Sequence, residues 1–326
     1  MSLPIHLPRR FRTTNFICLS ALVVISFIFI FTLTIVSYNT YCHDASVKGV
    51  MAGLEKEYWK EGEIDFLPIL MPVCDRPEYL KEVLSALAKN HDIDKTVLIV
   101  SQDGNNREIE ALIKNITLPS RVIHLRHIRP FLSIPSYVHT NEYATAANVK
   151  FLLEFAFDYL KAPGAIVLES DLKPAADMFT YFTWAFKNIL QNPEYNNVLN
   201  INSFNMDSRP DSDPYTLTPA EFTVWGWCTS ADRWSLLKDN WTKFGNWDIN
   251  VQENIRIPNH MVSMTPLLAR VKNIGRVGIN FDMSEEEFHQ WEKVYINEDR
   301  VIPYYNHVPH VVLTNLSSQA VEHFKA

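Results

Sequence analysis

Short apolar stretches alternate with helical segments between residues 66 and 168, and this alternation constrains the fold more than any other feature. The expected strands span 66–73, 96–100, 121–125 and 165–168, and the expected helices begin at Pro77 or span 106–114 and 142–160. Strands and helices that alternate at this pace form βαβ units. The sequence therefore predicts an α/β, Rossmann-like fold with a mostly parallel sheet and helices on both faces.

Polar residues follow three of these strands directly. The three tips read Cys-Asp-Arg at 74–76, Ser-Gln-Asp at 101–103 and Glu-Ser-Asp at 169–171. Open parallel sheets bind ligands beyond the carboxyl ends of their strands, so we expect the tips to converge on one crevice. The chain has no GxGxxG and no GxxxxGK[ST], so a dinucleotide or P-loop site lacks its main support. The net charge of −7 argues against nucleic-acid binding.

The N-terminal region contains an uncharged apolar run from residue 16 to 36. A helix needs about 20 residues to cross about 30 Å of hydrocarbon, so the run predicts a membrane anchor rather than a cleaved signal. Arg9, Arg10 and Arg12 precede it, which favours a cytosolic N-terminus. We expect a cytosolic tail at 1–15, an anchor at 16–37 and a polar stem at 38–62.

Sequons and cysteines fit a luminal body without defining it. The sequons begin at Asn115, Asn240 and Asn315. Cys74 and Cys228 could pair with each other, Cys42 could join two chains, or the thiols could be free and buried.

The tip at 169–171 has the residue types of a divalent-metal site. Hard ions such as Mn²⁺ or Mg²⁺ prefer oxygen ligands and can bridge a carboxylate to the diphosphate of a UDP-sugar. Such an ion would neutralise the UDP leaving group. Acidic residues at a strand end are also common surface chemistry, so Glu169 and Asp171 alone do not decide between these interpretations.

Two further tip residues suit a nucleotide. Asp103 could accept the N–H of uracil, and Arg76 could meet a phosphate or the ribose. Either residue could instead be a solvated turn residue or cap the following helix.

Several strings occur in the order of a known family. They are Cys74-Asp75-Arg76, Ser101-Gln102-Asp103-Gly104, Val167-Leu168-Glu169-Ser170-Asp171-Leu172, Trp225-Gly226-Trp227, Trp247-Asp248, Ile257-Pro258, Arg270-Val271-Lys272-Asn273-Ile274-Gly275 and Phe281-Asp282. Together they resemble the N-acetylglucosaminyltransferase I family, which includes the protein O-mannose N-acetylglucosaminyltransferases. The resemblance covers residues 66–282.

The resemblance implies a GT-A fold, UDP-GlcNAc as donor, Mn²⁺ and inversion by direct displacement. By position, Asp171 would be the metal ligand and Glu169 would support it. Asp103 would hold the uracil, and Arg76 would lie near the nucleotide. Asp248 would be the general base, and one base suffices for an inverting transfer.

The resemblance also implies a place in the cell and a partner. The chain would be a single-pass type II protein of the Golgi membrane, with a luminal catalytic domain at 63–282 and a short C-terminal extension at 283–326. Its acceptor would be a mannose-terminated glycan of a glycoprotein.

The chain departs from the family pattern at several positions. Ser170 replaces the central acidic residue of the triplet, and Gly104 replaces a Cys that could have paired with Cys74. Asn148 stands where family members carry a nucleotide-contacting His, and Asn280 falls near a donor-contacting Ser. Ser170, Asn148 and Asn280 remain candidates for the nucleotide-sugar site.

Other interpretations stay open at this stage. The protein could use another UDP-sugar, or it could be an inactive membrane-anchored homologue that binds a nucleotide sugar or glycan. Asp248 could instead be the N-cap of a helix over 249–255. Trp225 and Trp227 could stack on sugar faces, or pack in the core.

Overall fold

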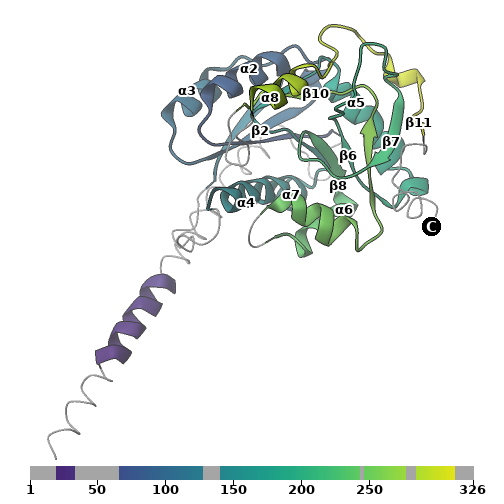
Figure 1. Ribbon diagram of the computed structural model, residues 1–326. Coiled ribbons are helices and arrows are strands. Elements are labelled where there is room, and N and C mark those ends of the chain that lie inside the picture. The colour runs from purple at the N-terminus through teal and green to yellow at the C-terminus, as the bar shows by residue number, and fades with distance from the viewer. Residues whose placement is uncertain (1–19, 34–65, 128–139, 243–245, 277–283, 313–326) are drawn as a thin grey trace, which may run out of the picture.

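The computed structural model describes residues 20–33, 66–127, 140–242, 246–276 and 284–312. Residues 20–33 form a helix with exposed apolar side chains, shown in purple in Figure 1. Within the described ranges, none of the helices combines the length and the apolar character that a membrane crossing requires. The expected tail, both ends of the expected anchor and the stem lie outside the described residues, so the anchor remains a prediction.

A nine-stranded sheet forms the centre of the fold, in the order β11-β7-β9-β6-β8-β4-β1-β2-β3 (Figure 1). The strands are β1 Ile69–Val73, β2 Val97–Asp103, β3 Arg121–His127, β4 Gly164–Val167, β6 Val198–Asn202, β7 Thr216–Ala220, β8 Trp227–Ser230, β9 Val262–Pro266 and β11 His310–Val311.

The first half of the sheet is parallel, as the sequence predicts. β1 pairs in parallel with β2 and β4, and β2 pairs in parallel with β3. Every residue of β1 is buried, which explains why its sequence is continuously apolar rather than alternating. The α/β class is therefore confirmed.

The second half of the sheet mixes strand directions. β8 runs antiparallel to both β4 and β6, whereas β6 and β9 are parallel. β7 is antiparallel to β9, and β11 adds to β7 in parallel. The start of β8 therefore lies at the same edge of the sheet as the ends of β4 and β6.

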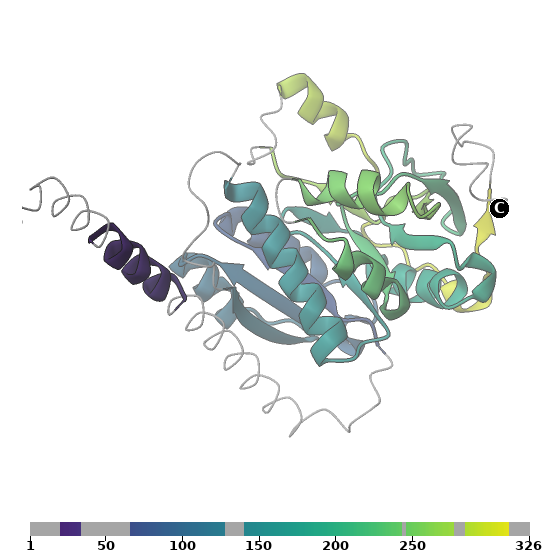
Figure 2. The ribbon, with the colours of Figure 1, turned by 90° about the horizontal axis from the view of Figure 1, so that it is seen from below.

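Helices cover both faces of the sheet. They are α2 Pro77–Leu87, α3 Arg107–Asn115, α4 Thr140–Glu154, α5 Met178–Ala185, α6 Ala231–Asp239, α7 Trp247–Ile249 and α8 Glu285–Glu292. Buried side chains of α2, α3 and α5 belong to one core cluster, and those of α4, α6 and α7 belong to a second. Figure 2 shows α4, α6 and α7 together on the lower face.

Local sequence explains where these helices begin. Pro77 opens α2, where its missing N–H costs no helical hydrogen bond. The side chain of Asn106 caps α3 by accepting from the amides of Glu108 and Ile109. The long helix expected over 142–160 is α4, continued by a π-helical turn at Phe155–Tyr159.

A two-stranded ribbon, β5 Leu172–Pro174 with β10 Val271–Asn273, lies beside the main sheet. Next to it, Arg270 and Asp177 form a fully buried ion pair with an Nε–Oδ2 distance of 3.0 Å. Tyr304 donates to the same Asp177 oxygen at 2.6 Å, which ties the C-terminal segment to the core. A buried charge needs such partners, because an unpaired one is strongly destabilising.

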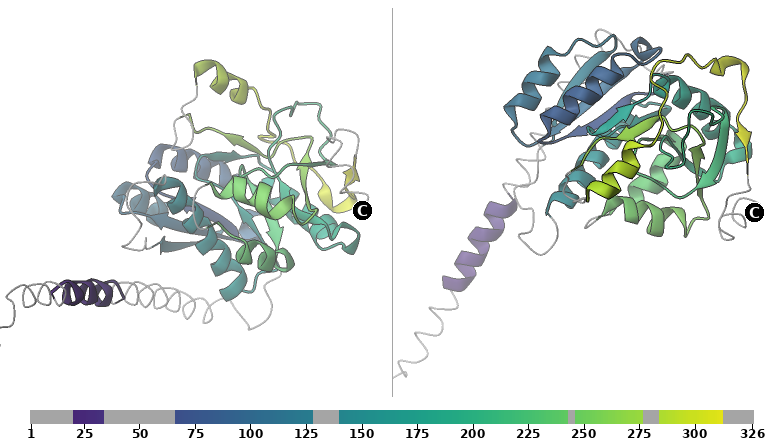
Figure 3. Two further views of the ribbon diagram at one scale, coloured as in Figure 1. Left: turned by 60° about the horizontal axis from the view of Figure 1, so that its bottom comes forward. Right: turned by 45° about the horizontal axis from the view of Figure 1, so that its top comes forward.

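α8 projects from the body in the left view of Figure 3. Cys74 and Cys228 are not joined to each other by a disulfide. Cys228 lies buried in β8, which matches the alternative of a free buried thiol.

Candidate functional site

The three tips follow the same edge of the sheet. Val73 pairs with Gln102, and Leu70 pairs with Val167, so β1, β2 and β4 end side by side. The amide of Leu168 also donates to the carbonyl of Leu70 at 2.9 Å, which carries the pairing one residue beyond β4. The convergence expected from the sequence is present in the structure.

Arg76 and Asp171 come together from different strands. The Arg76 Nη1–Asp171 Oδ2 distance is 2.8 Å, and the side chains are 36% and 12% exposed. Arg76 also lies over the ring of Tyr79, with its Cζ 5.5 Å from the centroid. The pair leaves Arg76 in contact with solvent, from where it can reach a ligand.

The β5–β10 ribbon fixes the position of Asp171. The amide of Ile274 donates to the Asp171 carbonyl at 2.9 Å, and the amide of Gly275 donates to Asn273 Oδ1 at 2.8 Å. A Cβ added at Gly275 would lie 2.7 Å from Asp171 Oδ2 and 3.2 Å from Asp171 Cβ. Only glycine therefore lets the chain pass this close to the carboxylate.

Replacing Gly275 tests this close approach. We expect Gly275→Ala to weaken Mn²⁺-dependent binding of UDP about 10-fold, because the methyl group displaces the Asp171 carboxylate. Isothermal titration of UDP at saturating Mn²⁺ measures the effect. Gly104→Ala is the control: it also adds a methyl group to a glycine near the crevice, and it strains the backbone there (φ +78°), but its methyl group would meet nothing within 4 Å. Equal affinities in the two variants would contradict the role of Gly275.

Carboxyl groups gather at the end of β4. Burial raises the pKa of Glu169 to about 8, with the charge of Asp171 adding to the rise, Arg76 opposing it and Asp248 adding a smaller part. Ser170 between the two acids is buried. The pKa of Glu169 therefore also reveals that Asp248, far along the chain, is close enough to act on the same region.

Asp248 lies in the first turn of α7, not at its N-cap, which is Asn246. The N-cap interpretation of Asp248 is therefore wrong. Its neighbour Trp247 is buried and stacks on Trp241 at a centroid distance of 5.6 Å. This packing fixes the start of α7, and Asp248 is left half-buried.

Asp103 is the last residue of β2 and is buried. Its Oδ1 lies 3.5 Å from Nδ1 of His127, the last residue of β3. His127 was missed by the sequence reasoning because the third strand was expected to end at Leu125. Had the third strand been predicted to end at His127, its polar end would have been compared with the other three tips.

Asn148 on α4 is buried behind the same tip. Its Oδ1 accepts from Ser101 Oγ at 2.5 Å, and its Nδ2 donates to the Ser101 carbonyl at 3.1 Å. These bonds tie α4 to β2. Asn280 and the string 281–282 lie outside the described residues.

The two tryptophans of the 225–227 string differ. Trp227 is fully buried in the second core cluster, so the core interpretation holds for it. Trp225 is only partly buried and contacts Phe204 and Trp291. Trp291 was missed because it lies in the stretch 283–326, which was expected to be only a short C-terminal extension.

The residues at the three tips suit a divalent metal ion that is held partly by the protein and partly by the phosphates of the substrate. Among the described residues, no group of three His, Cys, Asp or Glu side chains is arranged to hold an ion. Mg²⁺-type ions are usually bound by one or two carboxylates together with substrate phosphates. Asp171, supported by Glu169, can supply that share, and Arg76 can add a positive charge for a diphosphate.

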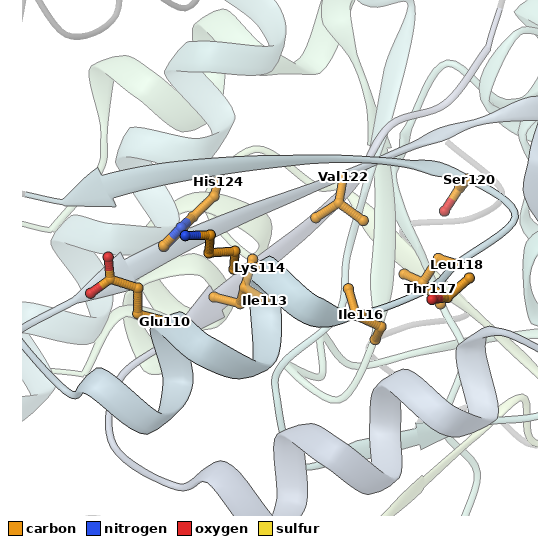
Figure 4. A pocket seen from close by; sticks show the side chains of 9 residues that line it. All are labelled: Glu110, Ile113, Lys114, Ile116, Thr117, Leu118, Ser120, Val122 and His124. Atoms are coloured by element: carbon orange, nitrogen blue, oxygen red, sulfur yellow. The ribbon is translucent and has the colours of Figure 1, made fainter.

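A separate pocket of about 480 Å³ lies between α3 and β3 (Figure 4). Glu110, Lys114 and His124 line it together with apolar side chains, and Thr117 of the first sequon is at its border. Burial lowers the pKa of His124, and the charge of Arg126 lowers it further. None of the predicted site residues lines this pocket.

Comparison with known proteins gives a family and a distant relative. A family model described as the GNT-I family matches residues 40–306. The relative is "Alpha-1,3-mannosyl-glycoprotein 2-beta-N-acetylglucosaminyltransferase" of Arabidopsis thaliana, with 25% identity over 226 residues. The match covers 67% of this chain and 49% of the relative, so the chain spans about half the length of that protein.

Solved structures overlap more weakly. The mannosyltransferase PcManGT of Pyrobaculum calidifontis, in complex with GDP-Man and Mn²⁺, has a TM-score of 0.42 and 13% identity, covering 76% of this chain and 70% of that one. TarS of S. aureus has a TM-score of 0.40 and 12% identity, covering 70% of this chain and 42% of that one. At these scores, neither overlap assigns an activity to this chain.

Proposed function

Because this chain belongs to the GNT-I family, we propose that it is a metal-dependent glycosyltransferase of the GT-A type. It transfers GlcNAc from UDP-GlcNAc to a mannose-terminated glycan of a glycoprotein, with inversion at the anomeric carbon. The observation that carries the proposal is the meeting of Arg76, Glu169 and Asp171 at the carboxyl edge of the sheet. Ligands of open α/β sheets bind at this edge.

In this proposal Asp171 is the ligand of Mn²⁺ or Mg²⁺, and Glu169 and Ser170 complete the donor side. The ion, when bound, supplies Lewis-acid charge that stabilises the departing UDP. Arg76 leaves its contact with Asp171 and turns to a diphosphate oxygen. This exchange is available because the Arg76 side chain is 36% exposed.

The nucleotide lies over the parallel strands. Asp103 accepts the N–H of uracil, as a buried carboxylate at the end of β2 can do. Asn148 holds β2 from behind, and Asn280 belongs to the donor side by its position in the sequence. Asp248 takes the proton of the acceptor hydroxyl as that oxygen attacks the sugar.

The proposed location follows from the sequence. An anchor over 16–37 would place the catalytic domain in the Golgi lumen as a type II membrane protein. Its partners would then be the UDP-sugar, the glycan acceptor and the membrane.

Titration of UDP with and without Mn²⁺ tests the proposal. We expect UDP to bind residues 62–326 with micromolar affinity in Mn²⁺ and at least about 10-fold more weakly in EDTA, because the carboxylates repel a bare diphosphate. A panel of UDP-sugars then identifies the donor by transfer or hydrolysis. No UDP binding under either condition would refute the enzyme. Binding without turnover of any donor would favour the inactive homologue.

A further inference from the structure

Three aromatic side chains form a partly exposed cluster at the edge that carries the carboxylates. This aromatic rim consists of Phe204, Trp225 and Trp291. Trp225 meets Phe204 edge-to-face at a centroid distance of 4.5 Å and Trp291 at 4.3 Å. Phe204 is buried, whereas Trp225 and Trp291 are only partly so. The cluster therefore presents indole surface to solvent.

Strand pairing places the rim at the edge of the sheet where β4 ends. Val167, the last residue of β4, pairs with Trp227, the first residue of β8, and the two strands are antiparallel. Trp225 therefore precedes β8 at the same edge of the sheet at which Glu169 follows β4. β6, which leads into Phe204, is the next strand outward. With strands about 4.8 Å apart, the rim begins about 5–10 Å from the β4 tip, on the side opposite Asp103.

Gly226, the residue after Trp225, has a backbone conformation that residues other than glycine rarely adopt. Gly226 has a φ of +72°, and a Cβ there would lie 2.3 Å from Ser203 Oγ. Ser203 Oγ instead donates to the carbonyl of Gly226 at 2.8 Å. A glycine at positive φ is thus required for the chain to present Trp225 at this edge.

α8 carries Trp291 and is attached to the body by more than the contact of Trp291 with Trp225. Lys272 donates to the carbonyl of Glu292, Arg276 pairs with Glu285 at 2.9 Å, and the chain after α8 forms a bridge from Ala269 to Ile296. Polar and backbone contacts therefore help to hold Trp291 beside Trp225.

The two sugars of a transfer place different demands on the protein. The donor sugar is attached to the charged diphosphate, which Arg76 and the carboxylate region hold. An acceptor sugar is uncharged and must be held by hydrogen bonds and by contacts to its apolar C–H face. Aromatic side chains that are only partly buried suit such a contact.

We infer that the aromatic rim is the acceptor subsite, in which Trp225 stacks on the terminal pyranose of the glycan and Phe204 and Trp291 hold its ring in place. The inference rests on the proposed transfer, because it takes the carboxylate region as the donor side. Trp225 is then a specificity-determining residue that selects neutral pyranosides and does not contact UDP.

Saturation-transfer NMR with methyl α-mannoside, together with kinetics on the same acceptor, tests this subsite. In the presence of UDP and Mn²⁺, wild-type protein should transfer saturation to the C–H protons of one sugar face. Trp225→Ala should lose that signal and raise the KM for the acceptor on the order of tenfold. Trp225→Phe should retain part of both. The Kd for UDP and the KM for UDP-GlcNAc hydrolysis should stay at their wild-type values.

Tyr215→Ala is the matched control. Tyr215 is also a partly buried ring in an aromatic cluster, stacked on His307 and edge-on to Trp184, but it precedes β7, the second-outermost strand at the far side of the sheet. It should leave the acceptor KM unchanged. Absence of sugar contact in the wild type, or an equal rise of the donor KM in Trp225→Ala, would overturn the subsite. A failure of the wild type to bind UDP would instead refute the proposed function. Should Trp225→Ala not fold, Trp225→Phe and the wild-type NMR contact decide.

Discussion

Asp171→Ala is expected to weaken Mn²⁺-dependent binding of UDP by at least about 100-fold while the protein stays folded. Asp171 is the carboxylate that converges with Arg76 at the end of β4, and it is the proposed protein ligand of the ion. Without Asp171 the ion would be held less tightly. The diphosphate would then lie near the carboxyl groups of Glu169 and Asp248 with less positive charge beside it. Calorimetric titration of UDP at several Mn²⁺ concentrations measures the loss.

The matched control for this variant is Asp75→Ala. Asp75 is an exposed carboxylate at the tip of β1, next to Arg76, and it makes the same change in net charge. We expect it to bind UDP as the wild type does. Stability should change little in either variant, because an ion pair that reaches solvent contributes little to the free energy of unfolding. Retained Mn²⁺ dependence in Asp171→Ala would show that the ion is held elsewhere.

The parallel half of the fold could be predicted because its signal is local. A strand buried on both faces reads as an unbroken apolar run, and β1 and β4 are such runs. The bounds were less accurate at polar ends. Residues 101–103 were expected to follow the second strand but belong to β2, because β3 continues beside them to His127.

The antiparallel half could not be predicted in the same way. β8 enters between β4 and β6 from far along the chain, and no local pattern encodes such a neighbour. The β5–β10 ribbon could not be predicted for the same reason, because it joins residues that are about 100 positions apart. Pairings of this kind depend on the packing of the whole chain.

The residues of the candidate site also fall into those that local patterns predicted and those that depend on long-range pairing. The sequence predicted that Arg76 and Asp171 would meet, since both follow parallel strands. Gly275 was not expected beside Asp171, because the β5–β10 ribbon brings the two together. Sugar stacking was considered for Trp225, but its ring neighbours Phe204 and Trp291 depend on long-range packing and were not predicted. The role proposed for Asp248 comes from the resemblance, and the structure adds that its charge contributes to the raised pKa of Glu169.

Asp248→Asn is expected to lower kcat about 10²–10⁴-fold while UDP still binds in Mn²⁺ with nearly the wild-type affinity. The amide keeps the size of the side chain but cannot accept the proton of the acceptor hydroxyl. Because burial is the main cause of the raised pKa of Glu169 and the charge of Asp248 adds a smaller part, its removal should lower that pKa only slightly. Initial rates at saturating donor and acceptor measure the loss of kcat, and a parallel titration of UDP measures the retained affinity.

Glu253→Gln is the control for the loss of one negative charge in the same helical region. Glu253 is an exposed residue of the helical segment that continues α7, five residues beyond Asp248. It should retain wild-type kcat. If Asp248→Asn and Asp171→Ala lose UDP binding equally, Asp248 belongs to the donor site and another group must remove the proton. If Asp248→Asn instead binds UDP but does not transfer, the carboxylates divide the work between holding the leaving group and activating the acceptor.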